Sequence, residues 1–204
     1  MSNPTGIVYL LDDELGMVKA VTRLLRARGF EVHGFTSPAS FLEAYRPESD
    51  SCLILDVAMP ELDGLHLQRR LTHKGILLPI VFLTGHGDIP MSVRAMKAGA
   101  VDFLTKPVKD TDLLRAVRAA LARAAEQREA GTISARLTRL TPREREVMEH
   151  VIAGKLNKQI AFDLGTGEQN IKIHRGRMMH KMGLESVTDL VRIAEKLGIG
   201  RKED

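Results

Sequence analysis

The run Ile7-Val8-Tyr9-Leu10-Leu11 is short and apolar, and it ends on two carboxylates, Asp12 and Asp13. Three later runs follow the same plan, and each ends on a polar residue of a different chemical kind. They are Leu53–Leu55 before Asp56, Ile80–Leu83 before Thr84, and Val101–Thr105 before Lys106. Ligands of open parallel sheets bind beyond the carboxyl ends of the strands, so these polar ends are expected to form one site.

The first 122 residues are predicted to alternate strands with helices, as in an α/β domain built on a parallel sheet. Between the runs, apolar residues recur at helical spacing, for example at Met17, Val21 and Leu24. The second strand is the most polar and suits a sheet edge, whereas the other four are expected to be buried on both faces. The expected strands cover residues 7–11, 31–35, 52–55, 80–83 and 101–105.

The 204-residue chain is 44% hydrophobic and 27% charged, as expected of a soluble globular protein with one or two domains. It has no apolar run of about 18 residues and no signal-peptide pattern, so we expect a cytoplasmic protein without a membrane partner. The single cysteine, Cys52, excludes an intramolecular disulfide. The seven histidines show no zinc-ligand spacing.

The positive charge is concentrated in the last third of the chain. Residues 1–120 carry 14 basic and 14 acidic residues, so the whole net charge of +4 comes from the remainder. The segment from Lys155 to Lys181 contains six basic residues but only two acidic ones, Asp163 and Glu168. Such a cluster indicates a polyanion-binding surface, and a solvated helix face is the alternative on charge alone.

A helical extension and linker are expected over residues 123–138, with an interruption at Gly131–Ser134. After it, Thr141-Pro142-Arg143-Glu144 has the pattern of a capping box, in which the threonine and the glutamate satisfy each other's free amides. The region from 139 to 204 is expected to form four short helices, separated by glycines.

The chemistry of the first site follows from its charges. Asp12, Asp13 and Asp56 would place about three negative charges in one crevice, which requires a hard cation such as Mg²⁺. Thr84 can donate its hydroxyl to a phosphoryl oxygen, and Lys106 can pair with another. Each residue alone has a simpler interpretation: an aspartate after a strand can be a helix cap, and Lys106 can be a surface lysine. Their joint occurrence at successive strand ends favours a phosphoryl-transfer site.

This arrangement resembles the receiver domain of two-component response regulators over residues 6–122. The motifs are Leu11–Glu14, Leu55–Pro60 with Asp63-Gly64, Leu83–Gly85, and Phe103–Pro107. The resemblance implies a flavodoxin-like five-stranded parallel sheet of order 2-1-3-4-5. It also implies that Asp56 takes a phosphoryl group from a sensor histidine kinase. Mg²⁺ or Mn²⁺ would bind Asp13, Asp56 and the Ala58 carbonyl directly and Asp12 mainly through water, and the Lys106–Pro107 bond would be cis.

The resemblance also implies a switch, in which Thr84 moves toward the phosphate and Phe103 rotates inward behind it. Phe103 as an immobile core residue is the alternative. The neighbouring helix would then change its surface, and Met91, Arg94 and Lys97 are the predicted face of a phosphorylation-dependent homodimer.

A phosphatase of similar fold is the enzyme alternative. Such enzymes place a second aspartate two residues after the nucleophile, and here that position is Ala58. With no proton carrier there, slow loss of the phosphoryl group is expected, which suits a switch and not a catalyst. His86 could approach the phosphoryl group, although an ordinary loop residue is the simpler interpretation.

A helix-turn-helix needs a small residue between its helices, a turn residue with positive φ and an apolar residue that packs the second helix back. Ala161, Gly165 and Ile171 have these roles at suitable spacing. Residues 139–198 resemble the four-helix LuxR/NarL-type DNA-binding domain, and the whole chain resembles a NarL/FixJ-type transcriptional regulator. By this resemblance, the base edges of double-stranded promoter DNA would contact Lys172, Ile173 and Gly176, and its phosphates would lie nearer Lys158, Asn170, Arg175 and Lys181. Arg177 is a further expected DNA contact. RNA polymerase is a further expected partner.

The second helix of this motif, the recognition helix, is expected at about Glu168–Met182. Departures from the family pattern include Leu156 and Gly167 at helix starts, Asn170 where threonine is usual, and Gly176 inside the recognition helix. Glycine inside a helix costs about 1 kcal/mol, so DNA binding is expected to survive with altered specificity. A phosphate-independent DNA-binding protein, whose receiver serves as an interaction platform, is the second hypothesis. The complete set of Asp12, Asp13, Asp56, Thr84 and Lys106 favours the phosphorylated switch.

Overall fold

The computed structural model describes residues 6–47, 49–60, 63–85, 88–196 and 198–199. The chain forms two compact units, Met1–Arg128 and Glu129–Asp204. In the part of the chain described, no helix has both the length and the apolar character that crossing a bilayer requires.

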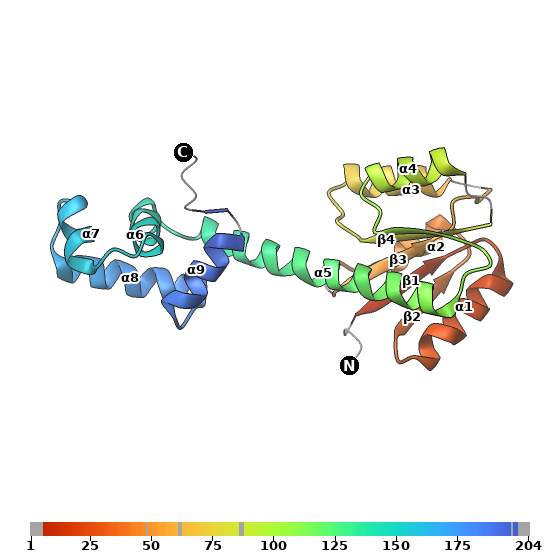
Figure 1. Ribbon diagram of the computed structural model, residues 1–204, viewed down its shortest axis with the longest axis horizontal. Coiled ribbons are helices and arrows are strands. Elements are labelled where there is room, and N and C mark those ends of the chain that lie inside the picture. The colour runs from red at the N-terminus through yellow and green to blue at the C-terminus, as the bar shows by residue number, and fades with distance from the viewer. Residues whose placement is uncertain (1–5, 48, 61–62, 86–87, 197, 200–204) are drawn as a thin grey trace. The chain divides into compact units, whose positions relative to one another are not determined.

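The first unit is built on a five-stranded parallel sheet of order β2-β1-β3-β4-β5, which confirms the predicted order (Figure 1). The polar strand β2 lies at an edge, as predicted. The expectation that the last strand is buried on both faces is wrong. β5 forms the other edge and is only half-buried, because within the described residues it pairs on one side alone, with β4. The strands are β1 Ile7–Leu11, β2 Glu31–Phe35, β3 Ser51–Leu55, β4 Ile80–Thr84 and β5 Asp102–Thr105.

Helices cover both faces of this sheet (Figure 1). In β1, Val8 and Leu10 point into the core shared with α1 and α5, while Tyr9 and Leu11 point into the core under α2, α3 and α4. This alternation follows from the two-residue period of a strand. The helices are α1 Leu15–Ala27, α2 Pro38–Ala44, α3 Gly64–His73, α4 Ile89–Lys97 and α5 Asp110–Thr138.

Helix α5 runs without a break through Gly131–Ser134, so the expected interruption is wrong. An interior glycine costs about 1 kcal/mol, but packing outweighs this local preference. Ile133 is 5% exposed and joins the core of the second unit, with Leu137 packed against the same cluster. The helical part of the predicted extension is therefore longer than the sequence indicated.

The second unit contains the four further helices that were predicted, and they surround a core of aliphatic and methionine side chains. The predicted capping box is present: Glu144 N–H donates to Thr141 Oγ1, and Thr141 N–H donates to Glu144 Oε2. Met178 and Met182 are buried, as expected of core residues. The helices are α6 Pro142–Ile152, α7 Asn157–Asp163, α8 Glu168–Met182 and α9 Val187–Lys196.

Candidate functional site

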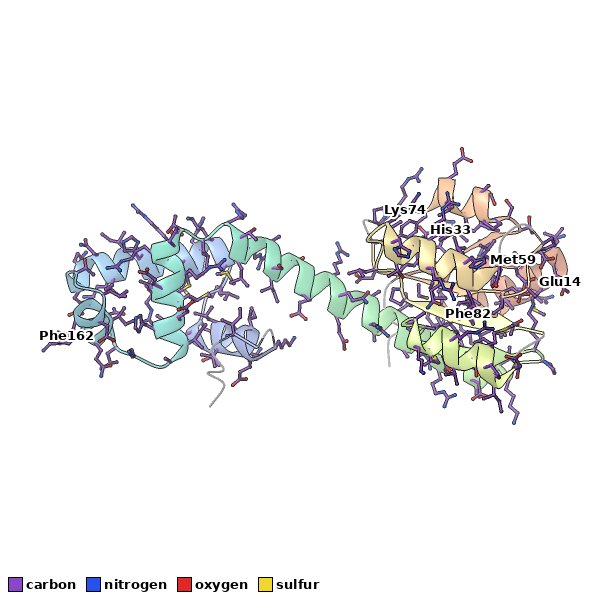
Figure 2. All side chains as sticks on the ribbon, turned by 90° about the horizontal axis from the view of Figure 1, so that it is seen from above. Glu14, His33, Met59, Lys74, Phe82 and Phe162 are labelled. Carbon is purple, nitrogen blue, oxygen red and sulfur yellow. The ribbon has the colours of Figure 1, made fainter. Side chains whose placement is uncertain are left out.

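The sheet brings the predicted polar residues together at the carboxyl ends of its strands. Backbone hydrogen bonds continue past the strand ends: the Asp56 amide donates to the Leu11 carbonyl at 2.9 Å, and the Lys106 amide donates to the Thr84 carbonyl at 2.8 Å. Asp56 and Lys106 are thereby fixed beside the neighbouring strands. In Figure 2, Glu14 and Met59, which follow these strand ends in sequence, lie at one end of the unit and Lys74 lies at the other.

The three predicted carboxylates meet at this end of the sheet. Asp12 and Asp56 are 1% and 4% exposed, while Asp13 is exposed. One oxygen from each carboxylate lies within 4.8 Å of the others. Lys106 Nζ donates to Asp12 Oδ2 at 2.6 Å and to Asp56 Oδ2 at 2.9 Å. Residues separated by 94 and 50 positions in the chain therefore form one cluster.

Two opposing effects act on the pKa of Lys106. Burial by itself would lower this pKa, but the hydrogen bonds and negative charges of Asp12 and Asp56 outweigh burial and raise it above its ordinary value. The ammonium form is thus held between the two carboxylates at neutral pH. The Lys106–Pro107 bond is cis, as the resemblance implied.

The donor set of this cluster fits a hard divalent cation. Three carboxylates against one ammonium leave about two uncompensated negative charges, and carboxylate oxygens are the ligands that Mg²⁺ prefers. Because Asp13 is exposed, the cluster opens to water, which Mg²⁺ keeps in its coordination shell. The amide of Ala58 donates to Asp56 Oδ1 at 3.2 Å, which holds this carboxylate in place.

A glycine after the β3 loop has a role that residue-by-residue reasoning missed. A Cβ atom on Gly64 would lie 2.3 Å from the backbone oxygen of Asp56, so a side chain here would displace the loop that carries this aspartate. The Gly64 amide also donates to the Val57 carbonyl, and Asp63 Oδ1 caps α3 through the Leu65 amide. The Asp63-Gly64 pair in the sequence is the signal for this close approach.

The predicted switch residues lie in the same unit. Thr84 is fully buried at the end of β4. Phe103 on β5 is half-buried and packs beside Phe82, with 6.0 Å between the ring centroids. His86 lies outside the described residues.

The predicted dimer face on α4 is only partly exposed. Arg94 and Lys97 are exposed, but Met91 is half-buried and packs against the core. Ala95 is the one fully buried residue of α4. The exposed apolar residues of this helix, which the sequence analysis missed, are Ile89, Val93 and Met96.

In the second unit, α7 and α8 form the predicted helix-turn-helix. Gly165 adopts φ +60° in the turn, and the Thr166 amide donates to the Ala161 carbonyl at 2.9 Å. Ala161 and Ile171 are buried between the helices. The predicted N-cap departures are also present, since neither Leu156 nor Gly167 makes a side-chain cap hydrogen bond.

The predicted DNA contacts divide into two groups. Most are exposed: Lys158, Asn170, Lys172, Ile173, Gly176 and Arg177. Two are half-buried and bind other side chains of the unit. Arg175 donates to Asn157 Oδ1 at 2.9 Å, and Lys181 Nζ lies 2.6 Å from Glu144 Oε2.

Glu144 links the capping box of α6 to the last turn of α8. Its side chain is 3% exposed, and burial by itself would raise its pKa. The hydrogen bonds from Lys181 and Thr141 outweigh burial, so that the pKa of Glu144 is below its ordinary value. Lys181 therefore balances a buried charge, a role that the charge pattern of the sequence did not indicate.

Two family models match the chain. The response regulator receiver domain covers residues 8–118, and the luxR family of bacterial regulatory proteins covers residues 138–194. These families are regulators and not enzymes, which argues against the phosphatase alternative.

Similar proteins match over nearly the whole chain. Nodulation protein W of Bradyrhizobium diazoefficiens is 48% identical over 95% of this chain and 87% of its own length. Transcriptional regulatory protein FixJ of the same species is 41% identical over 95% of this chain and 97% of its own length. The solved structure of the response regulator StyR matches with a TM-score of 0.71 at 43% identity, over 93% of this chain and 98% of its own. The chain therefore belongs to the NarL/FixJ subfamily of response regulators, with a receiver domain and a LuxR-type DNA-binding domain.

Proposed function

We propose that Asp56 accepts a phosphoryl group from a sensor histidine kinase and that this modification controls binding to promoter DNA. The observation that carries the proposal is the buried cluster in which Lys106 contacts both Asp12 and Asp56, with Asp13 alongside. A purely structural ion pair needs one carboxylate for each lysine. The surplus negative charge favours a divalent cation, Mg²⁺ or Mn²⁺, held by Asp12, Asp13, Asp56 and the Ala58 carbonyl.

In the transfer step, a carboxylate oxygen of Asp56 forms a bond to phosphorus as the bond from phosphorus to the kinase histidine breaks. The electron pair of that bond stays on the leaving imidazole nitrogen. The bound cation would neutralise charge on the phosphoryl oxygens. Lys106 would turn from the Asp56 carboxylate to a phosphoryl oxygen, and Thr84 would donate its hydroxyl to another.

The phosphorylated state is expected to be long-lived enough to signal. Hydrolysis is faster when a neighbouring group takes the proton of the attacking water, and the exposed residue two positions after Asp56 is Ala58, which has no such group. The attacking water would therefore react without general-base assistance.

Phosphorylation adds about −1.5 to −2 charge beside Thr84 and Phe103. We infer that these residues carry the change to α4, whose few buried contacts make it the helix most easily repositioned. The dimer face would comprise Arg94 and Lys97, with Met91 at its inner edge, and a dimer would present two recognition helices to a two-fold-symmetric site. DNA-bound protein could then recruit RNA polymerase.

Mass spectrometry of the intact protein tests phosphoryl transfer. With acetyl phosphate and Mg²⁺ the wild-type chain should gain the mass of one phosphoryl group, and Asp56→Asn should gain none. Asp63→Asn is the matched control, since Asp63 caps α3 outside the carboxylate cluster, and it should be phosphorylated normally. No mass gain in the wild type, with DNA binding intact, would favour the phosphate-independent alternative.

Light scattering tests the output. The molecular mass should double when the protein is phosphorylated, and Arg94→Glu should reduce this change without preventing phosphorylation of Asp56. An equal mass under both conditions would overturn the proposed dimer.

A further inference from the structure

The exposed side of helix α8 has a notch, where the helix lacks a side chain. Gly176 lies in the middle of this side, one turn after Lys172 and Ile173 and one turn before His180. Apart from its chain neighbours and the backbone of the helix, no described atom lies within 4 Å of the place that a Cβ atom of Gly176 would take. The notch is therefore open to molecules outside the unit.

Packing inside the second unit does not explain this glycine. Glycine is unfavourable in the interior of a helix, and it is usually kept there for a positive φ or for the close approach of another group. Gly183 meets both conditions, since its φ is +63° and a Cβ atom there would lie 3.0 Å from the guanidinium of Arg136. Gly176 has a helical φ and no such neighbour among the described residues.

The side chain that borders the notch on its N-terminal side is apolar. Ile173 is 43% exposed and lies outside the core cluster that contains Ile171. The ammonium group of Lys172 lies 3.6 Å from the carboxylate of Glu168, one turn further from Gly176. Ile173 is therefore the side chain that offers a contact beside the notch, and the group that fits there is small and apolar.

We propose that this notch accepts the methyl group of a thymine, so that Gly176 determines base specificity at one position of the DNA site. The inference rests on the proposed function, in which α8 enters the major groove of promoter DNA. The C5-methyl group of thymine is the apolar group that an unmodified base pair exposes in this groove. The methyl group approaches the backbone of Gly176 and packs on Ile173. A longer side chain at position 176 would take its place.

Replacement of thymine by uracil tests the contact, because uracil lacks the methyl group but keeps the same hydrogen-bonding groups. The full-length protein, with acetyl phosphate and Mg²⁺, first selects its sites from random DNA duplexes. Each thymine of a selected site is then replaced in turn, and affinity is measured by fluorescence anisotropy. One thymine in each half-site should lose affinity by about fourfold, the effect of exposing one buried hydrocarbon group.

The outcomes separate this inference from the proposed function. If every uracil substitution changed affinity by less than twofold, the methyl contact would be overturned, while DNA binding by α8 would stand. If the protein selected no DNA sequence at all, sequence-specific binding would fail, and the methyl contact would fail with it.

A matched pair of variants assigns the contact to the notch. Gly176→Lys should fold, since its Cβ atom meets no described atom, and it should bind the thymine and uracil sites equally because its side chain fills the notch. Gln169→Lys is the control. It adds the same charge to an exposed position of α8 two turns earlier, leaves the notch open and should keep the fourfold preference. A preference that persists in Gly176→Lys, or that is lost in both variants, would contradict the assignment.

Discussion

The carboxylate crevice of the receiver and the exposed face of α8 use charge in opposite ways. In the crevice, Asp12 and Asp56 are buried and share Lys106. On α8, Lys172 and Arg177 are exposed. Burying a charge requires a partner within the protein, whereas an exposed charge can be kept for another molecule. Lys181 lies on the same helix, α8, but pairs with buried Glu144. Position on this helix therefore does not determine whether a basic residue is exposed or balances a buried charge.

The largest expected effect is in the crevice. Lys106→Met leaves two buried carboxylates without their counter-charge, and loss of one partner of a buried ion pair costs about 3–5 kcal/mol. The free energy of unfolding of the receiver should fall by about this amount without divalent cation, and Mg²⁺ should restore part of it. Urea denaturation with and without Mg²⁺ measures both changes.

Lys109→Met is the control, since Lys109 is exposed three residues away and should change stability by less than about 0.5 kcal/mol. If the two variants were equally stable, Lys106 would not be balancing buried charge, and the contrast between crevice and recognition helix would fail.

The second prediction compares two bases on one helix. Lys181→Met should destabilise the second unit by about 2 kcal/mol, because Glu144 stays buried and charged without its partner. Arg177→Met should leave stability unchanged. Amide hydrogen exchange in α6 and α8 measures the difference, and equal protection in both variants would mean that the Lys181–Glu144 pair contributes nothing.

The sequence predicted the receiver more completely than the recognition surface. The carboxyl ends of parallel strands lie at the same end of a sheet, so the strand pairing alone brings Asp12, Asp56 and Lys106 together. This result does not depend on how the side chains of the core pack. The role of Lys181 depended on a contact with a residue 37 positions away, which no local pattern encodes. The continuity of α5 through Gly131 likewise depended on burial of Ile133.

A third prediction concerns pH. The pKa of Glu144 is lowered in the folded state, so its contribution to stability is present above the ordinary value of 4.5 and is lost as pH falls through the lower folded value. Glu144→Gln should therefore reduce the loss of stability between neutral pH and pH values below 4.5. Circular dichroism melts across this range measure the slope.

Glu146→Gln is the control variant, because Glu146 forms an exposed pair with Arg143. The stability of this variant should depend on pH as that of the wild type does. An unchanged slope in Glu144→Gln would show that another group governs acid unfolding of this unit.

The smallest expected effect is on DNA affinity. If Arg177 contacts a phosphate, Arg177→Met should weaken binding to all sequences alike and should reduce the slope of log affinity against log salt by about one. Fluorescence anisotropy at several salt concentrations measures the slope. A loss confined to the cognate sequence would instead indicate a base contact.

Chemical trapping of the phosphorylated residue tests the central claim most directly. Borohydride reduces an aspartyl phosphate, so that peptide mass spectrometry identifies the modified position after incubation with acetyl phosphate. The account predicts labelling at Asp56 alone, dependent on Mg²⁺ and strongly reduced in Asp13→Asn. Labelling at another carboxylate, or labelling of Asp56 that is indifferent to Mg²⁺, would contradict it.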